Sequence, residues 1–351
     1  MQRKITIGII GAGRIGRIHA EHLTHDVPES RVKSISDIDL EAAQKCASDL
    51  GVTNACEDYR IILEDREIDA VVISSSSETH ALILEAAAEA GKHIFCEKPI
   101  AHDLEVIERA LKTAERNRIK LMVGFNRRFD PNFRRIHEYI KEGRIGDPQI
   151  LRITSRDPYP PPIEYVKASG GIFMDMMIHD FDMARFQSGA EVDEIYTLAS
   201  VRNEELRAAG DLDTALVMLR FTNGAVGTID NCRQAVYGYD QRIEVFGTKG
   251  MAYSDNNTPT RTHLYTSEKV QEDLPLPYFM ERYMESYRNE IRHFVDCLVA
   301  DKQPSVTGMD GYLPVVMGKA ARLSHDQQRP VKLSEIAQTA KSSSDLSEKI
   351  S

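Results

Sequence analysis

The glycine-rich run GAGRIG, which starts at Gly11, is the feature that most constrains the fold. The apolar run ITIGII precedes it and an amphipathic stretch follows it, which predicts a tight turn from a buried strand into a helix. In such a turn Gly11 permits the bend, Gly13 lets the backbone approach a pyrophosphate, and Gly16 lets the helix pack on the strand. The helix start at Arg14 and Ile15 adds amide donors and partial positive charge. The run therefore predicts a dinucleotide site, with a glycine turn that binds nothing as the alternative.

An acidic residue, Asp37, ends the second predicted strand at the spacing at which a carboxylate meets the adenosine ribose. A carboxylate accepts hydrogen bonds from a 2′-hydroxyl and repels a 2′-phosphate, so NAD is favoured over NADP. Arg14 weakens that preference if it pairs with a phosphate. The alternative role for Asp37 is a helix N-cap, which Asp39 would fill equally well.

The first 125 residues alternate short apolar runs with amphipathic stretches, which predicts a parallel sheet covered on both faces. We therefore expect residues 1–125 to form an N-terminal Rossmann domain with a doubly wound sheet. The predicted strands are Ile5–Ile10, Val32–Ser36, Ala70–Ser74, His93–Cys96 and Leu121–Val123, and the predicted helices lie near His19–Leu23, Leu40–Leu50, Tyr59–Glu64, His80–Ala90 and Leu104–Asn117.

Beyond residue 126 the order of elements changes, and turn signals such as TNG and GTKG separate short strands as in antiparallel sheets. Residues 126–338 are expected to form a second, α+β domain, and the polar segment 339–351 a flexible tail. Its predicted helices are Asn132–Glu142, a run from residue 170 to residue 186, Glu281–Val299 and Tyr312–His325, and its predicted strands are Gln149–Ser155, Glu194–Val201, Thr214–Phe221, Ala225–Asn231, Gln241–Phe246 and Met251–Tyr253, with a proline-rich loop before the second helix.

Charge and cysteine usage exclude several classes of function. The 351-residue chain carries a formal net charge of −10, which repels nucleic-acid backbones and anionic lipid. Its five cysteines have neither CxxC pairs nor a disulfide-like spacing. No secretory signal and no run of about 18 apolar residues is present. We expect a cytoplasmic protein that binds neither nucleic acid nor membrane.

The run GGIFMDMMIHDFDMARF places three polar side chains in an otherwise apolar helix. Asp175, His179 and Asp182 fall at offsets of four and three, which predicts one solvent-facing stripe on a helix that is otherwise buried. Asp175 and His179 at this spacing could hold a metal ion, but no further ligand cluster is evident and we predict no metal. A packed or surface histidine is the plainer alternative.

A second polar anchor is the tripeptide EKP, in which Lys98 follows a buried strand at the carboxyl edge of the predicted sheet. Ligands of doubly wound sheets bind outside that edge. Pro99 restricts the backbone of Lys98 to extended values and thereby directs its ammonium group. A solvated loop lysine is the alternative interpretation.

These motifs resemble those of one family, the oxidoreductases grouped around glucose-fructose oxidoreductase, inositol 2-dehydrogenase and the rhizopine catabolism protein. The resemblance is carried by GIIGAGRIGRIHAEHL, CEKP, GFNRRFDPNF, GGIFMDMMIHDFDMARF and YGYDQRIEVFGTKG, and it covers nearly everything except the tail. It implies a Rossmann domain, a C-terminal domain built on an open and mostly antiparallel sheet, a substrate held between them, and a homo-oligomer, a tetramer or a dimer. Within the family the inositol 2-dehydrogenases are the most similar.

The resemblance also implies roles for single residues. Lys98, Asp175 and His179 correspond to the catalytic set, and Arg127, Asp157 and Tyr237 join them as substrate contacts, with Arg156 as a further candidate in the same loop. Besides the glycine turn and Asp37, the cofactor contacts expected from the resemblance are Ser74, Ser75, Ser76, His80, Glu97, Lys98 and Arg127. The run SSSSETH departs from the Thr-Pro pair that many relatives carry before the position of His80.

Oxidation of a secondary alcohol requires a base within hydrogen-bond reach of the hydroxyl. Histidine, with an intrinsic pKa of about 6.5, suits that role, and an ammonium group stabilises the developing alkoxide. The expected reaction is NAD-dependent oxidation of a small neutral polyol, foremost myo-inositol to 2-keto-myo-inositol, with His179 as base, Lys98 assisting and Asp182 orienting the imidazole. The alternatives are another inositol isomer or a pyranose, an NAD-dependent glycosidase, and a non-catalytic dinucleotide sensor.

Overall fold

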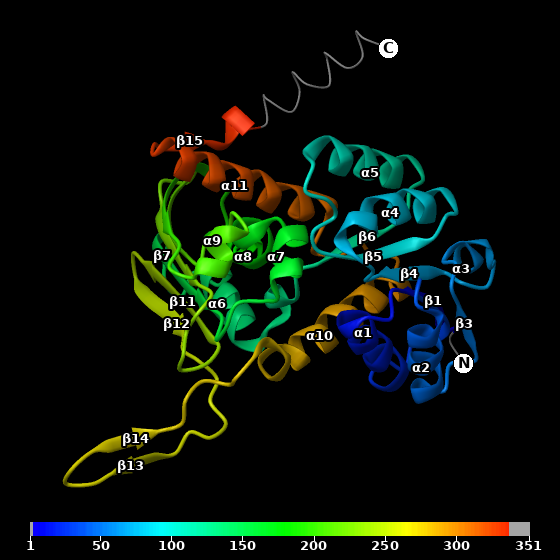
Figure 1. The fold of residues 1–351 in the computed structure, drawn as a ribbon, viewed down its shortest axis with the longest axis horizontal. Helices are drawn as coiled ribbons and strands as arrows, with labels where there is room; N and C mark the ends of the chain where they lie inside the picture. The colour runs from blue at the N-terminus through cyan, green and yellow to red at the C-terminus, as the bar shows by residue number, and fades with distance from the viewer. Residues whose placement is uncertain (1–2, 337–351) are drawn as a thin grey trace. The chain divides into compact units, whose positions relative to one another are not determined.

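A computed structural model describes residues 3–336 of the chain, and its backbone divides into two compact units (Figure 1). The first unit comprises residues 1–129 and 286–313, and the second comprises 130–285 and the segment from Pro314 onward. The division expected from the sequence follows chain order and therefore assigned 286–313 to the second domain. The predicted tail, 339–351, lies outside the described residues.

The first unit is built on a six-stranded parallel sheet with the order β3-β2-β1-β4-β5-β6. This is the Rossmann order, and it confirms the predicted doubly wound sheet. Figure 1 shows α4 and α5 together on one face of this sheet and α1 and α2 on the other. The elements are β1 (Ile5–Ile10), α1 (Arg14–His25), β2 (Ser30–Ser36), α2 (Leu40–Leu50), β3 (Asn54–Cys56), α3 (Arg60–Glu64), β4 (Ala70–Ile73), α4 (His80–Glu89), β5 (His93–Glu97), α5 (Leu104–Arg116) and β6 (Leu121–Gly124), with 3₁₀ turns at Ser77–Thr79 and Asn126–Phe129.

Local chemistry explains why the helices of this unit start where they do. Asp39 accepts hydrogen bonds from the amides of Glu41 and Ala42 and so caps α2, and Asp103 caps α5 in the same way. Strands β1 and β4 are almost entirely buried, as expected for a parallel sheet with helices on both faces. The short edge strand β3 was not predicted, because its three residues show no apolar pattern.

The second unit contains a seven-stranded sheet with the order β12-β11-β7-β10-β9-β8-β15. All of its pairings are antiparallel except that between β7 and β10, which confirms the mostly antiparallel sheet. Its strands are β7 (Pro148–Arg156), β8 (Val192–Ser200), β9 (Thr214–Phe221), β10 (Val226–Cys232), β11 (Asp240–Gly247), β12 (Gly250–Ser254) and β15 (Val331–Lys332).

Helices cover one face of this sheet, and side chains alternate between the two faces. In β9 every second residue, from Ala215 to Phe221, is buried, while Leu216 and Met218 are exposed. The helices are α6 (Pro131–Lys141), α7 (Ile163–Ser169), α8 (Ile178–Ser188) and α9 (Glu204–Ala208); α10 (Phe279–Val299) and α11 (Gly308–Gln327) each contribute residues to both units.

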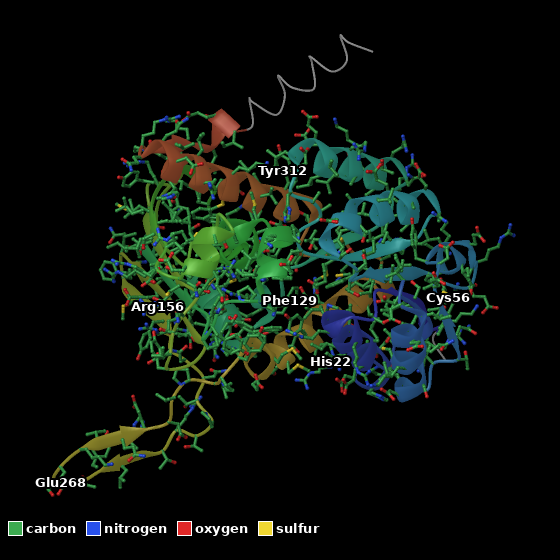
Figure 2. All side chains as sticks on the ribbon, viewed as in Figure 1. His22, Cys56, Phe129, Arg156, Glu268 and Tyr312 are labelled. Carbon is green, nitrogen blue, oxygen red and sulfur yellow. The ribbon has the colours of Figure 1, made fainter. Side chains whose placement is uncertain are left out.

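A two-stranded hairpin, β13 (His263–Tyr265) with β14 (Val270–Glu272), extends from the edge of the second unit's sheet and was not predicted. Glu268 lies at its tip (Figure 2). Every residue of both strands is exposed, including Leu264, Tyr265 and Val270. No helix within residues 3–336 is both long and apolar enough to cross a bilayer.

Candidate active site

The glycine turn has the geometry that its three glycines predict. Gly11 has φ +102°, and a Cβ atom there would lie 2.5 Å from the backbone of Ser74. A Cβ at Gly16 would lie 1.9 Å from the Gly11 carbonyl oxygen, so α1 packs on β1 only without a side chain at this position. A Cβ at Gly13 would meet nothing within 4 Å. The turn is therefore closed on its inner side and open at Gly13, which fits a diphosphate at the N-terminus of α1.

Asp37 lies beside this turn. Its Oδ2 accepts a hydrogen bond from the amide of Ala12 at 2.7 Å, and its Oδ1 accepts one from the amide of Asp39 at 2.9 Å. Because Asp39 caps α2, the N-cap role left open for Asp37 belongs to its neighbour. The position at the end of β2, against the glycine turn, is that of a ribose-binding carboxylate.

The serine run after β4 is held by hydrogen bonds within the first unit. The Ser74 hydroxyl donates to the Gly11 carbonyl oxygen at 3.0 Å, and the Ser75 hydroxyl pairs with that of Thr79 at 2.7 Å. The Ser76 carbonyl accepts from the amide and the hydroxyl of Thr79. These bonds fix the segment against the glycine turn; contact with a cofactor stays a prediction for all three serines.

His80 is buried and bridges two backbone segments. Its Nδ1 lies 2.8 Å from the Pro99 carbonyl oxygen and its Nε2 lies 3.0 Å from that of Ser75. Burial lowers the pKa of His80 below its usual value, although both carbonyls oppose that shift. In the neutral ring one nitrogen donates to one carbonyl. His80 therefore links the serine run to the EKP segment.

Lys98 follows Glu97, the last residue of β5, and precedes Pro99 through a cis peptide bond. This places it at the carboxyl edge of the parallel sheet, as predicted. Arg127 lies in the 3₁₀ turn after β6 and is 5% exposed, and the adjacent Arg128 pairs with Asp310 at 2.8 Å. The first unit thus gathers the glycine turn, Asp37, the serine run and Lys98 on consecutive strand ends.

Asp175 and His179 lie in the second unit, but the predicted continuous helix is wrong. Residues Ile172–Met176 form a π-helical turn, in which the amide of Met177 donates to the carbonyl of Ile172, and α8 begins only at Ile178. Gly170 and Gly171, both with positive φ, separate this turn from α7, which lies in the segment predicted to be a proline-rich loop. Single π turns inside helices often mark functional sites.

The predicted solvent-facing stripe is only partly correct. Asp175 and His179 are partly exposed, whereas Asp182 is completely buried. Asp180, for which the sequence suggested no role, is also buried and accepts a hydrogen bond from the Nδ2 of Asn231 at 2.9 Å. His179 and Asp182 both lie in the regular helix α8, so their different exposure reflects what packs against that helix, which offsets along the sequence do not show.

Asp175 has two partners that sequence reasoning missed. The Tyr165 hydroxyl donates to its Oδ1 at 2.9 Å, and an Arg233 guanidinium nitrogen lies 3.5 Å from its Oδ2. Arg233 is 1% exposed and also lies 3.6 Å from Asp211, whose Oδ1 accepts from the amide of Ile172 at 3.0 Å. The buried guanidinium of Arg233 thus links Asp175 to Asp211. Asp211 in turn holds the amide of Ile172 at the start of the π turn. No local motif marks Tyr165 or Arg233.

Asp157 and Tyr237 lie at the same edge of the second unit's sheet as Arg233. Because β7 and β10 are parallel neighbours with Arg156 opposite Cys232, the residues that follow these strands emerge together. The amide of Asp157 donates to the carbonyl of Cys232, and the carbonyl of Asp157 accepts from the amide of Ala235. Tyr237 donates to Asp240 at 2.6 Å and accepts from Arg156 at 3.0 Å. Figure 2 labels Arg156 in this region.

Charges around Tyr237 are balanced within the second unit. Arg156 pairs with Asp230, and this hydrogen bond raises the pKa of the Arg156 guanidinium above its usual value. Burial by itself raises the pKa of Asp240, but hydrogen bonds from Arg242, Tyr237 and Asn256 hold it below its usual value. Asp240 therefore stays ionised near neutral pH and orients the phenol of Tyr237.

Two further features do not involve the predicted catalytic residues Asp175 and His179. A hollow of about 1360 Å³ in the second unit lies between α6, β12 and the base of the hairpin, and none of the predicted site residues lines it. Within residues 3–336, one group of three side chains has the spacing of a possible metal site: His19, Glu97 and Glu290.

The parallel sheet, the open glycine turn and the carboxylate after β2 define a dinucleotide-binding protein of the Rossmann class. Residues 5–125 match the oxidoreductase family with an NAD-binding Rossmann fold, and residues 133–253 match the C-terminal domain of the same family. The chain belongs to the Gfo/Idh/MocA oxidoreductase family, as its sequence motifs indicated.

Individual relatives cover nearly the whole chain. The chain is 46% identical over 331 residues to the myo-inositol 2-dehydrogenase of Thermotoga maritima, covering 94% of this chain and 99% of that protein. The structure of a myo-inositol dehydrogenase from Corynebacterium glutamicum is similar with a TM-score of 0.90 at 36% identity, covering 94% and 99%. A myo-inositol dehydrogenase from Lactobacillus casei in complex with NAD(H) and myo-inositol is similar with a TM-score of 0.84 at 28% identity, covering 94% and 96%.

Proposed function

We propose that this protein oxidises one secondary hydroxyl of myo-inositol with NAD and yields 2-keto-myo-inositol. The observation that carries the proposal is the 46% identity, over 99% of its length, to a myo-inositol 2-dehydrogenase. The two polar segments of this chain that the chemistry needs support it: a lysine at the end of β5, and a helix start that presents Asp175 and His179.

In this proposal His179 accepts the hydroxyl proton, and the ammonium group of Lys98 stabilises the oxygen as negative charge develops on it. NAD, when bound, supplies the carbon that accepts the hydride. Asp175 accepts hydrogen bonds from substrate hydroxyls, because Tyr165 and Arg233 hold its carboxylate in place. The glycine turn holds the diphosphate, and Asp37 holds the adenosine ribose.

The proposed substrate is neutral and carries many hydroxyls. Each hydroxyl that a closed site leaves without a partner costs about 1–3 kcal/mol, so a polyol site needs several polar groups. Arg127, Asp157, Asp175 and Tyr237 are the proposed partners. Acidic groups in this set suit a neutral ring better than a sugar acid.

The direct test is the formation of NADH by the purified protein with myo-inositol, scyllo-inositol, chiro-inositol and glucose, each with NAD and with NADP. We expect the highest kcat/KM with myo-inositol and NAD. No nicotinamide reduction with any cyclic polyol would contradict the proposal, and release of a sugar without net NADH would favour a glycosidase. Faster reduction of NAD with another inositol isomer would support the same reaction and identify that isomer as the substrate.

Replacement of Asp37 by Asn tests the proposed preference for NAD. The amide oxygen keeps one of the two backbone hydrogen bonds, that from Ala12, and gives up that from Asp39, while the charge that repels a 2′-phosphate is removed. We expect the ratio of kcat/KM with NADP to that with NAD to rise about tenfold or more, since charges 4 Å apart interact by about 1–4 kcal/mol. Asp39→Asn is the matched control, because it keeps the cap of α2 and should leave the ratio unchanged. An unchanged ratio in Asp37→Asn would exclude the ribose role.

We further propose that the protein assembles as a homo-oligomer, a tetramer or a dimer. The face of the second unit's sheet opposite its helices carries exposed apolar side chains, which favours burial against another copy. These side chains include Leu198, Leu216, Met218, Val226, Phe246 and Tyr253. Sedimentation velocity measures the assembly state, and a monomer at micromolar concentration would contradict the proposal.

We also propose a cytoplasmic location. The five cysteines are free, which supports a reducing compartment.

A further inference from the structure

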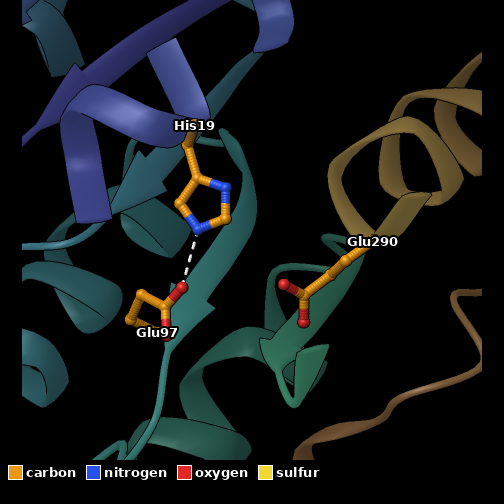
Figure 3. A group of neighbouring side chains, drawn as sticks. All are labelled: His19, Glu97 and Glu290. Atoms are coloured by element: carbon orange, nitrogen blue, oxygen red, sulfur yellow. Dashed lines mark hydrogen bonds and ion pairs between the residues drawn. The ribbon is translucent and has the colours of Figure 1, made fainter. Parts of the chain in front are cut away.

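A buried imidazole in the first unit contacts the residue directly before Lys98. His19 on α1 is completely buried, and its Nε2 lies 2.6 Å from the Oε1 of Glu97 at the end of β5. Figure 3 shows the His19 ring pointing from α1 toward Glu97. It also shows the carboxylate of Glu290 directed from α10 toward this pair. One nitrogen or oxygen atom from each of the three side chains lies within 4.8 Å of the other two. A charged or polar cluster of this kind is costly to bury unless its geometry is fixed.

Packing leaves the His19 ring little freedom. Its centroid lies 4.9 Å from that of Phe95 and 5.9 Å from that of Tyr287, and both ring pairs are T-shaped. Phe95 and Glu97 are two residues apart in β5, so their side chains lie on the same face of the strand, the face that α1 covers. Because packing holds the ring in place, its hydrogen bond restrains the position of the Glu97 carboxylate.

The Glu97 carboxylate is also held from the neighbouring strand. Glu97 lies opposite Gly124 in the β5–β6 pairing, and a Cβ at Gly124 would lie 2.9 Å from Oε2. The carboxylate thus lies flat on the glycine backbone at one side and against His19 at the other. These two contacts restrain the carboxylate of Glu97 at the end of β5, directly before Lys98.

The residues before and after Lys98 are each contacted by a histidine. His19 holds Glu97 before it, and His80 contacts the carbonyl oxygen of Pro99 after it. We propose that His19 is a positioning residue for the reaction: through Glu97 it fixes the direction of the Lys98 side chain. The role of Lys98 in this inference rests on the proposed function. Misplacement of a catalytic group by about 1 Å costs up to about a hundredfold in rate, so a restraint one residue away affects turnover.

The experiment compares three His19 variants that differ in their reach toward Glu97, together with one control variant. The side-chain amide of Gln reaches as far as the Nε2 of histidine, whereas that of Asn is shorter and Leu has no donor. We expect His19→Gln to stay close to the wild type. His19→Asn and His19→Leu should lower kcat about tenfold to a hundredfold with a smaller change in the KM of myo-inositol. His22→Leu is the matched control, because it removes a second histidine–carboxylate pair of α1, with Asp26 at 2.6 Å; it should change thermal stability at most.

A second measurement does not depend on the substrate. Trace acetylation of the NAD-loaded protein, followed by mass spectrometry, gives the labelling rate of Lys98 relative to the exposed Lys45 of α2. We expect this ratio to change several-fold in His19→Asn and to stay at the wild-type value in His19→Gln and His22→Leu. An unchanged ratio and kcat in His19→Asn, or an equal defect in His19→Gln, would overturn the inference. If the wild type oxidises no cyclic polyol, the proposed function fails, while the labelling ratios still decide the role of His19.

Discussion

Replacement of His179 by Ala is expected to lower kcat for inositol oxidation by about 10²–10⁴-fold, the usual contribution of a positioned general base. His179 is the second residue of α8 and is partly exposed, so its removal leaves the buried part of the helix intact. The affinity for NAD should stay near the wild-type value, because the glycine turn and Asp37 belong to the first unit. Steady-state kinetics and titration calorimetry with NAD measure the two quantities separately.

The matched control is His325→Ala, in the last turn of α11, which should keep the wild-type kcat. The pH profile gives a second readout: the acidic limb of kcat that a histidine base produces should disappear from the residual activity of His179→Ala. A kcat within a few-fold of the wild type would exclude His179 as the base, while a parallel loss of NAD affinity would indicate a folding defect.

Two substitutions in the glycine turn are expected to differ in their effect on stability. Gly11→Ala places a methyl group 2.5 Å from the backbone of Ser74 at a φ of +102°. Strained backbone costs of order 1–3 kcal/mol and overpacking about 1–3 kcal/mol more, so the first unit should be strongly destabilised. At Gly13 the φ is −66° and the space is open, so Gly13→Ala should leave the free energy of unfolding unchanged.

Gly13→Ala should nevertheless weaken NAD binding about tenfold or more, that is by at least about 1.4 kcal/mol, because its methyl group occupies the approach of the pyrophosphate. Thermal unfolding with and without NAD measures both effects in one experiment. Gly51→Ala, at the left-handed cap of α2, is the control for backbone strain without a ligand role. Unchanged NAD affinity in Gly13→Ala would contradict the proposed position of the diphosphate.

The nucleotide half of the site was largely predictable, because its signals are local. A strand, three spaced glycines and a helix start specify the turn within a dozen or so residues, and Asp37 ends the adjacent strand. Lys98 was also predictable as a residue at a strand end. The short strand β3 was missed because three polar or small residues have no detectable period, and α7 was missed because prolines precede it directly.

The surroundings of Asp175 were not predictable in the same way. Tyr165, Asp211 and Arg233 lie in three separate segments of the chain, and none of them forms a motif with Asp175. The π turn at Ile172–Met176 also has no sequence signal that separates it from a regular helix. Resemblance to a family predicted which residues form the site, but it did not predict what holds them.

By itself the sequence determined the Rossmann unit and the glycine turn, and it predicted the acidic residue at the ribose and the residue types of a hydride-transfer site. The Rossmann pattern and the glycine turn depend on backbone geometry within strand–turn–helix segments, where spacing along the chain fixes the distance between residues. The residue types of the hydride-transfer site came from the resemblance to a family. Only the tertiary structure decided that Arg233 holds Asp175, that Asp182 is buried and that His19 holds Glu97. Such contacts depend on which strands are neighbours and which helices cover them, and that order is set by the packing of the whole unit.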